Sequence, residues 1–480
     1  MGKRNRDNQA TTTEEVIPPV PDKPQQCHYF VKRKKRYCHL PARKANKYCG
    51  EHLQHEDNFD LKDGVQDPKR IRIPCPYDPN HTVYQHELDN HLKTRCNSRP
   101  PEIMPDYHLL NANVNTDQNL ENDKKLNELE KDKISKLLNN LSSGYDKLVP
   151  NINELISDHI SMDTQREKKK VYKHVDQQAS LIGHMKRLGL FRKDACYIEF
   201  GAGKGELSLH LLNALAHDTK ELEEPLDPTK TCQFVLVDRR NFRQKFDRHL
   251  RGEINHPQWI QDTEFHRINI DIKDLDLTKL KIATNRPVIA FSKHLCGSAT
   301  DLTLSALSKL QKEHNNVVGI VIALCCHQVC KPSMYPNLKF FLNNEIIDQP
   351  KDLSYLSTIS SWAICGHRDN KQAGEEVDDN EGEEDTDDQK DSETNDETAA
   401  NADKELNKEE PQPQDKIEHY SGLSHADREI LGYKTKRLID TGRLNYLQEE
   451  LDFNVELVKY VDKSVSLENV ALIATPKPKD

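Results

Sequence analysis

The sequence predicts an α/β fold in which helices cover both faces of a mostly parallel sheet, with small metal-binding modules before it. Two observations lead to this prediction. Short apolar runs alternate with helix-like segments over residues 160–480, which is typical of parallel strands joined by crossover helices. Cysteines and histidines cluster before residue 100. A chain of 480 residues has room for one core of roughly 250 residues with small appendages.

Cysteine usage predicts metal sites rather than disulfides. Twelve cysteines occur in a chain with no secretory signal at its start and no apolar run long enough to cross a bilayer. These features predict a protein of the cytoplasm or the nucleus that does not span a membrane. In such reducing compartments, grouped cysteines indicate metal binding. Residues 1–22 are expected to be disordered.

The first cysteine cluster predicts a zinc finger of the CCCH type within residues 23–58. Its ligands would be Cys27, Cys38, Cys49 and His52. Intervals of ten, ten and two residues separate them, and this set suits a tetrahedral zinc ion. His28, His39 and His55 compete for the fourth position. Because so short a segment buries little apolar surface, zinc would supply its folding free energy.

The second cluster predicts a zinc finger of the CHHC type within residues 72–99, in CPYDPNHTVYQHELDNHLKTRC. Its ligands would be Cys75, His81, His91 and Cys96. They are separated by five, nine and four residues, and Tyr84–Leu92 between them has helical character. Such a set of soft and borderline ligands suits a second zinc ion. The alternative is a polar surface helix with incidental histidines.

The charge of the first 99 residues indicates nucleic-acid binding. Lys and Arg outnumber Asp and Glu there, and Lys32–Arg36 (KRKKR) lies inside the first cysteine cluster. Tyr29, Phe30 and Tyr37 flank these cations. Cations neutralise phosphates and aromatic rings stack on bases, so this segment is a candidate RNA surface. A solvated loop or a nuclear import signal is the alternative.

Two helices are predicted before the first strand of the sheet. Residues 117–141 carry leucines and isoleucine at imperfect helical spacing among charges, which predicts a connecting or coiled-coil-like helix within residues 110–145. The stripe leaves the oligomeric state open. A second helix over Lys169–Leu190 should cap the sheet.

The first strand leads into a glycine loop and a helix in residues 197–212 (YIEFGAGKGELSLHLL). Gly201, Gly203 and Gly205 occupy alternate positions. Glycine suits a backbone that turns tightly and approaches a ligand, and the helix N-terminus beyond offers unpaired N–H groups. Together with Glu199, these glycines are candidate ligands of a nucleotide-like cofactor. Glycine turns also join strands to helices for structural reasons alone.

The second and third strands each end in a carboxylate. Gln233–Asp238 is an apolar strand whose last residue, Asp238, is placed to accept hydrogen bonds from both ribose hydroxyls of an adenosine. Phe265–Ile270 is a third strand-like run, and Asp271 follows it. Because open α/β sheets bind ligands beyond the carboxyl ends of their strands, both acids are candidate cofactor ligands.

The fourth and fifth strands end in reactive residues. Pro287–Ser292 leads into KHLCG at residues 293–297, and Val317–Leu324 leads into CCH at residues 325–327. The candidate catalytic residues at these ends are Lys293, His294 and His327. Their side chains can hold, orient or deprotonate a substrate hydroxyl.

The C-terminal part contains an acidic segment and a final hairpin. Residues 371–416 hold 19 acidic against 5 basic residues, which predicts a disordered insert and accounts for the net charge of −10. The insert separates a strand-like segment, Leu353–Cys365, from a helix-like one, Ser424–Leu447. Asn454–Val461 and Leu467–Ala474 predict an antiparallel hairpin.

Five alternating strands followed by a hairpin resemble the class I S-adenosylmethionine-dependent methyltransferase fold, which implies a Rossmann-like seven-stranded sheet. The dehydrogenase fingerprint Gly-x-Gly-x-x-Gly is absent. Residues 201–206 also lack the signature of a phosphate-binding loop, since Lys204 lies between glycines. S-adenosylmethionine is therefore favoured over NAD and ATP as the cofactor.

The two fingers followed by EFGAGKGELS, VLVDRRNFRQKFD, FSKHLCGSATDL and ALCCHQVC resemble the eukaryotic tRNA 2′-O-methyltransferase family that modifies nucleotide 4 of the acceptor stem. The resemblance covers nearly the whole chain outside the acidic insert. The CHHC finger is also similar to one in a minor-spliceosome protein, so that module alone implies only RNA binding. The resemblance implies an enzyme with S-adenosylmethionine and two zinc ions as cofactors and a tRNA acceptor stem as partner, and it leaves protein partners unknown.

The implied reaction requires a base, because a ribose hydroxyl is a weak acid that must lose its proton as it attacks the methyl group. Lys293 would orient the hydroxyl or hold the adjacent phosphate, while His294 or His327 accepts the proton. Structural roles for these residues, such as a backbone hydrogen bond of His294, are the alternative. The Lys-Asp-Lys-Glu set of some 2′-O-methyltransferases does not map onto this sequence.

Three alternatives stay open. Cys325 or Cys326 beside His327 could act as the nucleophile of an RNA cytosine C5-methyltransferase, although a Pro-Cys dipeptide occurs only at Pro74–Cys75. The same three residues with Cys330 could bind a third metal ion. A non-catalytic zinc-finger RNA-binding protein is the third alternative, which the intact glycine loop disfavours.

Overall fold

The computed structural model forms two compact units, residues 1–104 and 105–480. The described residues are 20, 25–31, 36–42, 47–49, 52, 72–96, 99, 103–116, 120, 122, 124–168, 172–218, 231–240, 242, 246–250, 263–364 and 419–478. Apart from Val20, the predicted disordered segments 1–22 and 371–416 lie outside this set, as do Lys32–Lys35 of the basic run. No helix in the described ranges has both the length and the apolar character that crossing a membrane requires.

The smaller unit contains two short antiparallel hairpins. They pair β1 (Phe30–Val31) with β2 (Arg36–Tyr37) and β3 (Arg72–Cys75) with β4 (Asp78–Tyr84). After β4 the chain is helical over Gln85–Glu87, α1 (Leu88–Asn90) and His91–Arg95, which confirms the predicted helical character. In the first finger the buried apolar cluster consists of Cys27, Cys38 and Cys49. A core made of thiols is what a metal-dependent module should have.

The larger unit is built on an eight-stranded sheet in the order β5-β11-β12-β10-β9-β6-β7-β8. The strands are β5 (Asn153–Glu154), β6 (Cys196–Phe200), β7 (Gln233–Asp238), β8 (Glu264–Asn269), β9 (Val288–Cys296), β10 (Val317–Cys325), β11 (Phe453–Lys459) and β12 (Val470–Pro476). The five strands from β6 to β10 are parallel, and β12 is antiparallel to both β10 and β11. This confirms the five predicted strands and the terminal hairpin. The strand order reverses between β6 and β9, which is where such sheets bind ligands.

The sheet has one strand more than the seven predicted. Asn153 and Glu154 of β5 pair in parallel with Val458 and Lys459 at the edge of the sheet. Both residues of β5 are exposed. Two exposed residues carry no alternation of apolar and polar side chains, so the sequence pattern could not reveal this strand.

The predicted strand over Leu353–Cys365 is wrong, because this segment is helical. It forms α11 (Leu353–Ser360), followed by a 3₁₀ turn over Ser361–Ile364. Leu353, Leu356 and Ile359 are fully buried, and their spacing of three places them on one face of the helix. The β-branched and aromatic residues of the segment suggested a strand, but the helical spacing decided the structure.

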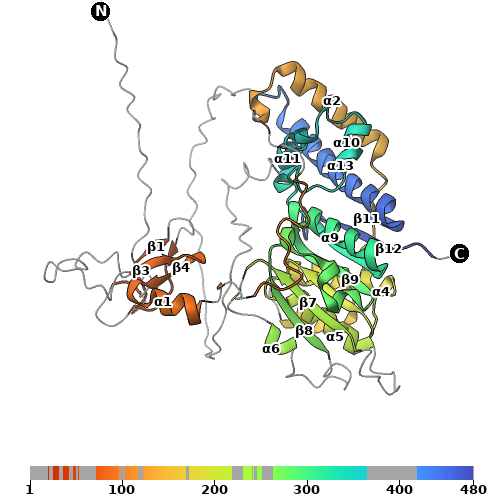
Figure 1. Cartoon of the computed structure of the whole chain (residues 1–480). Helices are drawn as coiled ribbons and strands as arrows, with labels where there is room; N and C mark the ends of the chain where they lie inside the picture. Colours follow the sequence, from red (N-terminus) through yellow and green to blue (C-terminus); the bar gives the residue numbers. More distant parts are fainter. Residues whose placement is uncertain are drawn as a thin grey trace, which may run out of the picture. The chain divides into compact units, whose positions relative to one another are not determined.

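Helices cover both faces of the sheet (Figure 1). On one face, α4 (Lys173–Arg187) and α5 (Glu206–Asp218) share an apolar core with β-strand residues such as Tyr197. On the other face, α9 (Ser298–His314) packs against Ile198 and its neighbours. The described part of this unit also contains the short helices α3 (Asp163–Lys168), α6 (Asp247–Leu250) and α8 (Lys281–Thr284). The α4 helix confirms the predicted cap of the sheet.

A separate helical layer adjoins the sheet. It contains α2 (Lys131–Leu148), α10 (Leu338–Asn343), α11 and α13 (His425–Leu451), which share a third apolar core (Figure 1). The α2 helix is the one predicted within residues 110–145, although it begins and ends later. Its apolar stripe, including Leu138 and Leu141, is buried in this core, so the stripe is not a free dimerisation face. The α13 helix confirms the predicted helix over Ser424–Leu447.

Candidate functional site

The glycine loop follows β6 at the point where the strand order reverses. Gly201, Gly203 and Gly205 have φ angles of 64°, 52° and 86°, a left-handed region that costs other residues about 1–2 kcal/mol. A Cβ atom on Gly201 would lie 2.9 Å from the carbonyl oxygen of His294. Within the described part of the chain, a Cβ atom on Gly203 would meet no atom within 4 Å apart from those of its chain neighbours. The loop therefore packs tightly against β9 but leaves open space over Gly203, as a cofactor cradle requires.

Asp238 ties the end of β7 to this loop. Its Oδ2 accepts a hydrogen bond of 2.8 Å from the backbone N–H of Gly203, and its Oδ1 accepts one of 2.8 Å from the N–H of Arg240. A carboxylate has about four acceptor sites, so it can still accept the hydroxyls of a ribose. The predicted cofactor residues Gly203 and Asp238 are thus in direct contact.

Glu199 supports the loop from the protein interior. It is 4% exposed, and its Oε2 accepts hydrogen bonds from the backbone N–H and the hydroxyl of Ser208 in the first turn of α5. Burial raises the pKa of Glu199 to about 7, although the Ser208 hydrogen bonds act in the opposite direction. This carboxyl group therefore joins β6 to α5, the strand and the helix on either side of the glycine loop. The predicted contact of Glu199 with a cofactor stays a prediction.

Asp271 begins a 3₁₀ turn just beyond β8, where its Oδ1 accepts a hydrogen bond of 3.0 Å from the N–H of Lys273. Its strand is the neighbour of β7, with Asn269 paired to Asp238. Asp271 therefore lies near the same carboxyl edge of the sheet as Asp238. Its role in cofactor binding stays a prediction.

Arg267 is part of the loop's support that the sequence did not reveal. Its Nη1 donates a hydrogen bond of 2.8 Å to the carbonyl oxygen of Gly203, and its Nε donates one of 2.9 Å to Asp247. Its side chain is 8% exposed. An arginine in the middle of a predicted strand is unusual, because buried charges need partners. Its position in the strand was the feature of the sequence that could have indicated a buried ionic contact.

Lys293 and His294 lie at the end of β9, beside the glycine loop. Both are half-buried, while His174 on α4 is exposed. The Nζ atom of Lys293 is 3.3 Å from Nδ1 of His174, and the rings of His174 and His294 stand edge to face with centroids 6.3 Å apart. Since an ammonium group only donates, Nδ1 of His174 must accept from a charged Lys293. His174 was not predicted, and it completes a group of three basic side chains at this edge.

His327 does not join this group of basic side chains. Its side chain is fully buried, and its Nε2 is 2.7 Å from Oδ1 of Asp440 on α13. Burial lowers the pKa of His327, although Asp440 acts in the opposite direction. With no exposed surface, this imidazole cannot reach a substrate in the present structure. Its predicted catalytic role stays untested, and its burial points to a structural role.

Asp440 belongs to a buried ionic cluster that fastens α13 to α9. Although burial opposes ionisation, His327, Arg437 and Arg443 hold the pKa of Asp440 at about 2. Arg443 is fully buried and donates hydrogen bonds of 2.8 Å to Asp301 and 3.1 Å to Asp440. The cluster therefore pairs each of these arginines with an opposite charge inside the protein, as buried ions require.

Cys325 and Cys326, at the carboxyl end of β10, lack the features of an activated nucleophile. The neighbouring thiol of Cys296 and, in addition, burial raise the pKa of Cys326. The pKa of Cys325 likewise lies well above the ordinary value of a thiol, for the same reasons. A nucleophilic cysteine needs the opposite shift, towards the thiolate. This environment disfavours the cytosine C5 alternative.

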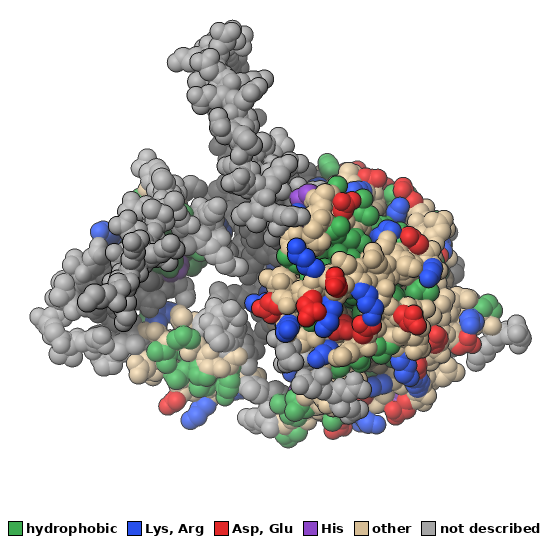
Figure 2. All heavy atoms as spheres, turned by 90° about the horizontal axis from the view of Figure 1, so that it is seen from above, with side chains coloured by type: hydrophobic (Ala, Val, Ile, Leu, Met, Phe, Trp, Pro, Cys, Tyr) green, Lys and Arg blue, Asp and Glu red, His purple; other side chains and the backbone are tan. Residues whose placement is uncertain are grey.

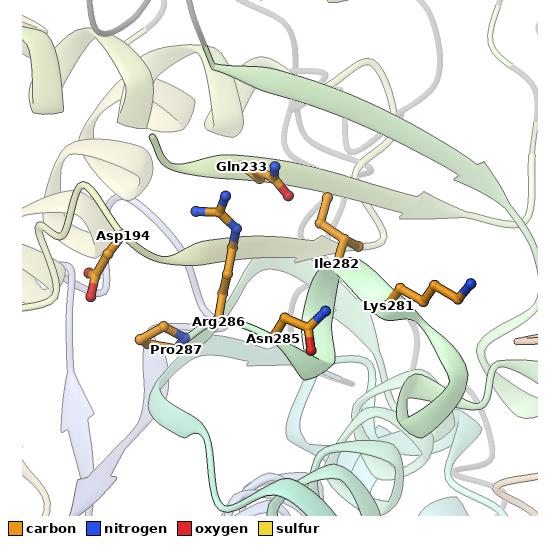
Figure 3. Close-up of a pocket in the computed structure, with 7 residues that line it drawn as sticks. All are labelled: Asp194, Gln233, Lys281, Ile282, Asn285, Arg286 and Pro287. Carbon is orange, nitrogen blue, oxygen red and sulfur yellow. The ribbon is translucent and has the colours of Figure 1, made fainter. Parts of the chain in front are cut away.

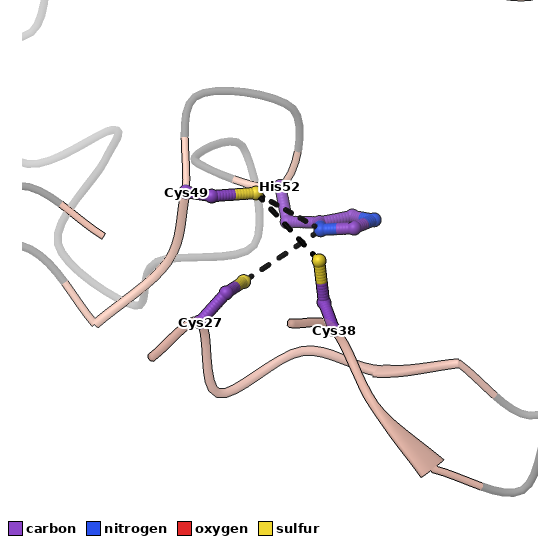
Figure 4. Close-up of side chains that lie close together, drawn as sticks. All are labelled: Cys27, Cys38, Cys49 and His52. Carbon is purple, nitrogen blue, oxygen red and sulfur yellow. Dashed lines mark hydrogen bonds between the residues drawn. The ribbon is translucent and has the colours of Figure 1, made fainter. Parts of the chain in front are cut away.

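The first finger brings its four predicted ligands together (Figure 4). Their ligand atoms all lie within 4.8 Å of one another. Nδ1 of His52 is 3.3 Å from Sγ of Cys49 and 3.6 Å from Sγ of Cys27, and the Sγ atoms of Cys38 and Cys49 are 4.0 Å apart. Bonds of about 2.3 Å to sulfur and about 2.0 Å to nitrogen would give similar separations around a tetrahedral zinc ion. Among the described histidines, His52 rather than His28 or His39 completes this set. His55 lies outside the described residues.

The second finger brings together three of its four predicted ligands. Nε2 of His91 and Sγ of Cys96 lie 3.3 Å and 3.6 Å from Sγ of Cys75. His81 is part of β4, but its side chain lies outside the described part of the chain. The three described ligands fit zinc, and the role of His81 stays a prediction.

The hollow drawn in Figure 3 and the glycine loop lie at opposite ends of the parallel strands. Its volume is about 540 Å³, and its lining includes Gln233, which begins β7, together with Asp194 and Pro287, which precede β6 and β9. The glycine loop follows β6, at the other end of the strand. The hollow is therefore not the cofactor cradle.

One face of the larger unit carries both signs of charge. Figure 2 shows Lys and Arg side chains interspersed with Asp and Glu side chains and with apolar patches on this face. Mixed charges attract a polyanion weakly. We therefore assign no RNA-binding role to this face.

The parallel sheet with reversed strand order, its antiparallel last pair, the glycine cradle and the acid after the second parallel strand define an α/β methyltransferase domain, here joined to two cysteine–histidine fingers. The family described as Methyltransferase TRM13 matches residues 176–475. The chain belongs to the TRM13 methyltransferase family. Its fingers match the CCCH zinc finger in TRM13 protein over residues 25–53 and the U11-48K-like CHHC zinc finger over residues 72–97.

Similar proteins span nearly the same length as this chain. The chain is 32% identical to the tRNA:m(4)X modification enzyme TRM13 of Debaryomyces hansenii, over 94% of this chain and 92% of the relative. It is 30% identical to the protein of that name from Saccharomyces cerevisiae, over 95% and 97%. It is also 30% identical to the TRM13 homolog of Mus musculus, over 94% of both.

Proposed function

We propose that this methyltransferase transfers a methyl group from S-adenosylmethionine to the ribose 2′-hydroxyl of nucleotide 4 in the acceptor stem of tRNA. The names of its relatives, tRNA:m(4)X modification enzyme, support tRNA as the substrate. The observation that carries the proposal is the contact of Gly203 with Asp238 in a glycine loop whose Gly201 packs against the backbone of His294, the neighbour of Lys293.

The cradle supports S-adenosylmethionine as the donor. Open space over Gly203 admits an adenosine-like group, while Asp238 is fixed by the loop and keeps acceptor sites for ribose hydroxyls. Bound there, S-adenosylmethionine supplies an electrophilic methyl group on a positively charged sulfur. In this scheme Arg267 holds the loop in place. Glu199, which fastens β6 to α5, remains a candidate cofactor ligand.

Lys293 and His294 support a hydroxyl as the acceptor. The Lys293 ammonium group would neutralise the phosphate next to the target ribose and orient the hydroxyl, and it is itself positioned by His174. His294 would accept the hydroxyl proton as the new C–O bond forms, which keeps the charge of the substrate unchanged. General bases of this kind contribute about 10²–10⁴-fold to a rate.

The fingers would bind the RNA. A helical acceptor stem offers its backbone, its shape and its 2′-hydroxyls, because the major groove of A-form RNA is too narrow for side chains. Contacts of that type suit small modules with exposed cations and aromatic rings. Tyr29 is stacked on the zinc-ligand candidate His52, so metal binding would fix part of the RNA surface.

The test is nucleoside mass spectrometry on tRNA incubated with the purified chain and S-adenosylmethionine carrying a labelled methyl group. We expect label in a 2′-O-methylnucleoside that maps to nucleotide 4. Label in 5-methylcytidine would overturn the ribose assignment in favour of Cys325 or Cys326. Absence of label, with tRNA and cofactor both bound, would favour the non-catalytic RNA-binding alternative.

A further inference from the structure

Three thiols meet at the carboxyl ends of β9 and β10, outside the fingers. They belong to Cys296, Cys325 and Cys326, and their Sγ atoms all lie within 4.8 Å of one another. The Sγ atoms of Cys296 and Cys325 are 3.8 Å apart. Cys296 is exposed, Cys326 is half-buried and Cys325 is buried, so the group is open to solvent on one side.

The backbone brings these thiols together in a way that an ordinary strand does not. Cys296 and Cys325 are directly paired across the β9–β10 ladder. Consecutive residues of a strand point to opposite faces, yet the Sγ atoms of Cys325 and Cys326 both approach that of Cys296. Cys326 has a φ angle of 50°, a left-handed conformation that costs a non-glycine residue about 1–2 kcal/mol. The strained residue is the one that brings the third thiol into the group.

The spacing of the thiols matches that of a zinc site. Four ligands at about 2.3 Å around a tetrahedral ion place sulfur atoms about 3.8 Å apart. The two fingers of this chain provide an internal standard, with Sγ separations of 4.0 Å for Cys38 and Cys49 and 3.6 Å for Cys75 and Cys96. The 3.8 Å between Cys296 and Cys325 lies between these two values.

The membership of the group differs from the third metal set considered from the sequence. Cys330 lies elsewhere, because its Sγ accepts a hydrogen bond of 3.1 Å from Arg443. The Nε2 atom of His327 is hydrogen-bonded to Asp440 instead. Cys296, which comes from another strand, takes their place.

We propose that Cys296, Cys325 and Cys326 bind a third zinc ion as thiolates, in addition to the two finger sites. Binding releases the three thiol protons to solvent. The fourth position is left to water, as in zinc sites with three protein ligands. The ion would join the carboxyl ends of β9 and β10 two residues beyond His294. This inference goes beyond the proposed function, which requires no third metal ion. Its test measures metal content and does not depend on methyl transfer.

The test is zinc content per chain, measured by inductively coupled plasma mass spectrometry on the full-length protein after reconstitution with zinc under a reducing agent. We expect three zinc ions in the wild-type chain and two in Cys296→Ser. Cys326→Ser should also hold two. The matched control is Cys232→Ser, which should hold three, because that thiol is buried 3.6 Å from the Thr263 hydroxyl and far from the group in sequence.

Two results would overturn the proposal. The first is a wild-type protein that holds only two zinc ions after reconstitution with excess zinc, when Cys296→Ser and Cys326→Ser also hold two. The other is a wild-type mass two units lower under non-reducing conditions, lost in Cys296→Ser, which would show that the thiols form a disulfide instead. Circular dichroism of both cluster variants verifies that the sheet is folded, so a lower zinc content reports loss of a ligand.

Discussion

Lys293 and His294 are adjacent in sequence, and we propose different tasks for them. Lys293 reaches His174 on α4, whereas the backbone of His294 contacts the cradle at Gly201. Neither residue forms part of the contact between Asp238 and the glycine loop. Their removal should therefore affect the chemical step while cofactor binding is preserved.

We expect His294→Ala and Lys293→Ala each to lower kcat for tRNA methylation by about 10²–10⁴-fold, the range for loss of a general base or a positioning group. The affinity for S-adenosylmethionine, measured by calorimetry, should change little. His174→Ala is the matched control, because it removes only a partner of Lys293 and should cost about tenfold or less. A kcat within threefold of wild type in both variants would contradict this assignment.

Gly201 and Gly189 allow the close approach at the cradle to be tested apart from backbone strain. Both have positive φ angles, 64° and 67°, so alanine at either position should lose about 1–2 kcal/mol of stability. Only at Gly201 would the new Cβ also lie 2.9 Å from a carbonyl oxygen. We expect Gly201→Ala to be the less stable variant in urea and to bind S-adenosylmethionine at least about tenfold more weakly. Equal stability and equal affinity would show that the close approach is unimportant.

His184 should make stability depend on pH. It is fully buried on α4, with Nε2 2.8 Å from the carbonyl oxygen of Leu155 and Nδ1 accepting from Arg187. Burial and, secondly, Arg187 lower the pKa of His184. The unfolded chain takes up a proton below about pH 6.5, but the folded chain resists it, so stability should fall as the pH falls below that value.

The variant that tests this is His184→Gln, whose side-chain amide can still donate to Leu155. We expect denaturation in urea at pH 7.5 and pH 5.5 to show a smaller loss of stability in the variant than in the wild type. The same loss in both proteins would mean that His184 does not contribute to the pH dependence.

At the scale of elements, strands and the site loop were the most predictable features. Buried parallel strands read as apolar runs, and Gln233–Asp238 was predicted with its observed bounds. The glycine loop is local in sequence, so Gly203 and Asp238 could be identified without tertiary information. Arg267 could not, because its contact with Gly203 joins residues 64 positions apart.

Failures at this scale have physical causes. Leu353–Cys365 is short and rich in strand-forming residues, and only its packing against α13 shows that the helical face is the buried one. The burial of His327 likewise depends on α13, which lies beyond the acidic segment in the chain. Such contacts join segments far apart in the chain. Local periodicity shows which residues share a face but not which distant helix covers that face.

The α13 helix should depend on its buried cluster and not on its surface ion pairs. Arg443 and Asp301 join α13 to α9 with no exposed side-chain surface, whereas Lys312 and Glu450 join the same helices with 54% and 40% exposure. Removing one partner of a buried pair costs about 3–5 kcal/mol, but an exposed pair contributes about 0–1 kcal/mol. In urea denaturation, we expect Arg443→Met to lower the free energy of unfolding by about 3–5 kcal/mol. Lys312→Met should lower it by about 0–1 kcal/mol. Similar losses in the two variants would show that burial does not distinguish these pairs.

At the scale of the whole molecule, our proposal assigns RNA binding to the finger unit and methyl transfer to the larger unit. Residues 1–104 and 105–480 form separate compact units. The finger unit has a core of metal-ligating thiols, whereas the larger unit has extensive apolar cores on both faces of its sheet. Loss of a finger ligand should therefore unfold its own module without unfolding the methyltransferase domain.

Cys49→Ser tests this division, because Cys49 is buried in the first finger and contacts both His52 and Cys38. We expect tRNA binding, measured by fluorescence anisotropy, to weaken by about tenfold or more, which corresponds to about 1.4 kcal/mol. The affinity for S-adenosylmethionine should stay within twofold of wild type, because Gly203 and Asp238 belong to the other unit. Cys196→Ser is the control for a buried cysteine outside the fingers, and it should leave tRNA affinity unchanged. Should Cys49→Ser lose cofactor affinity as strongly as tRNA affinity, the two units would have to act as one, and the assignment of RNA binding to the fingers alone would fail.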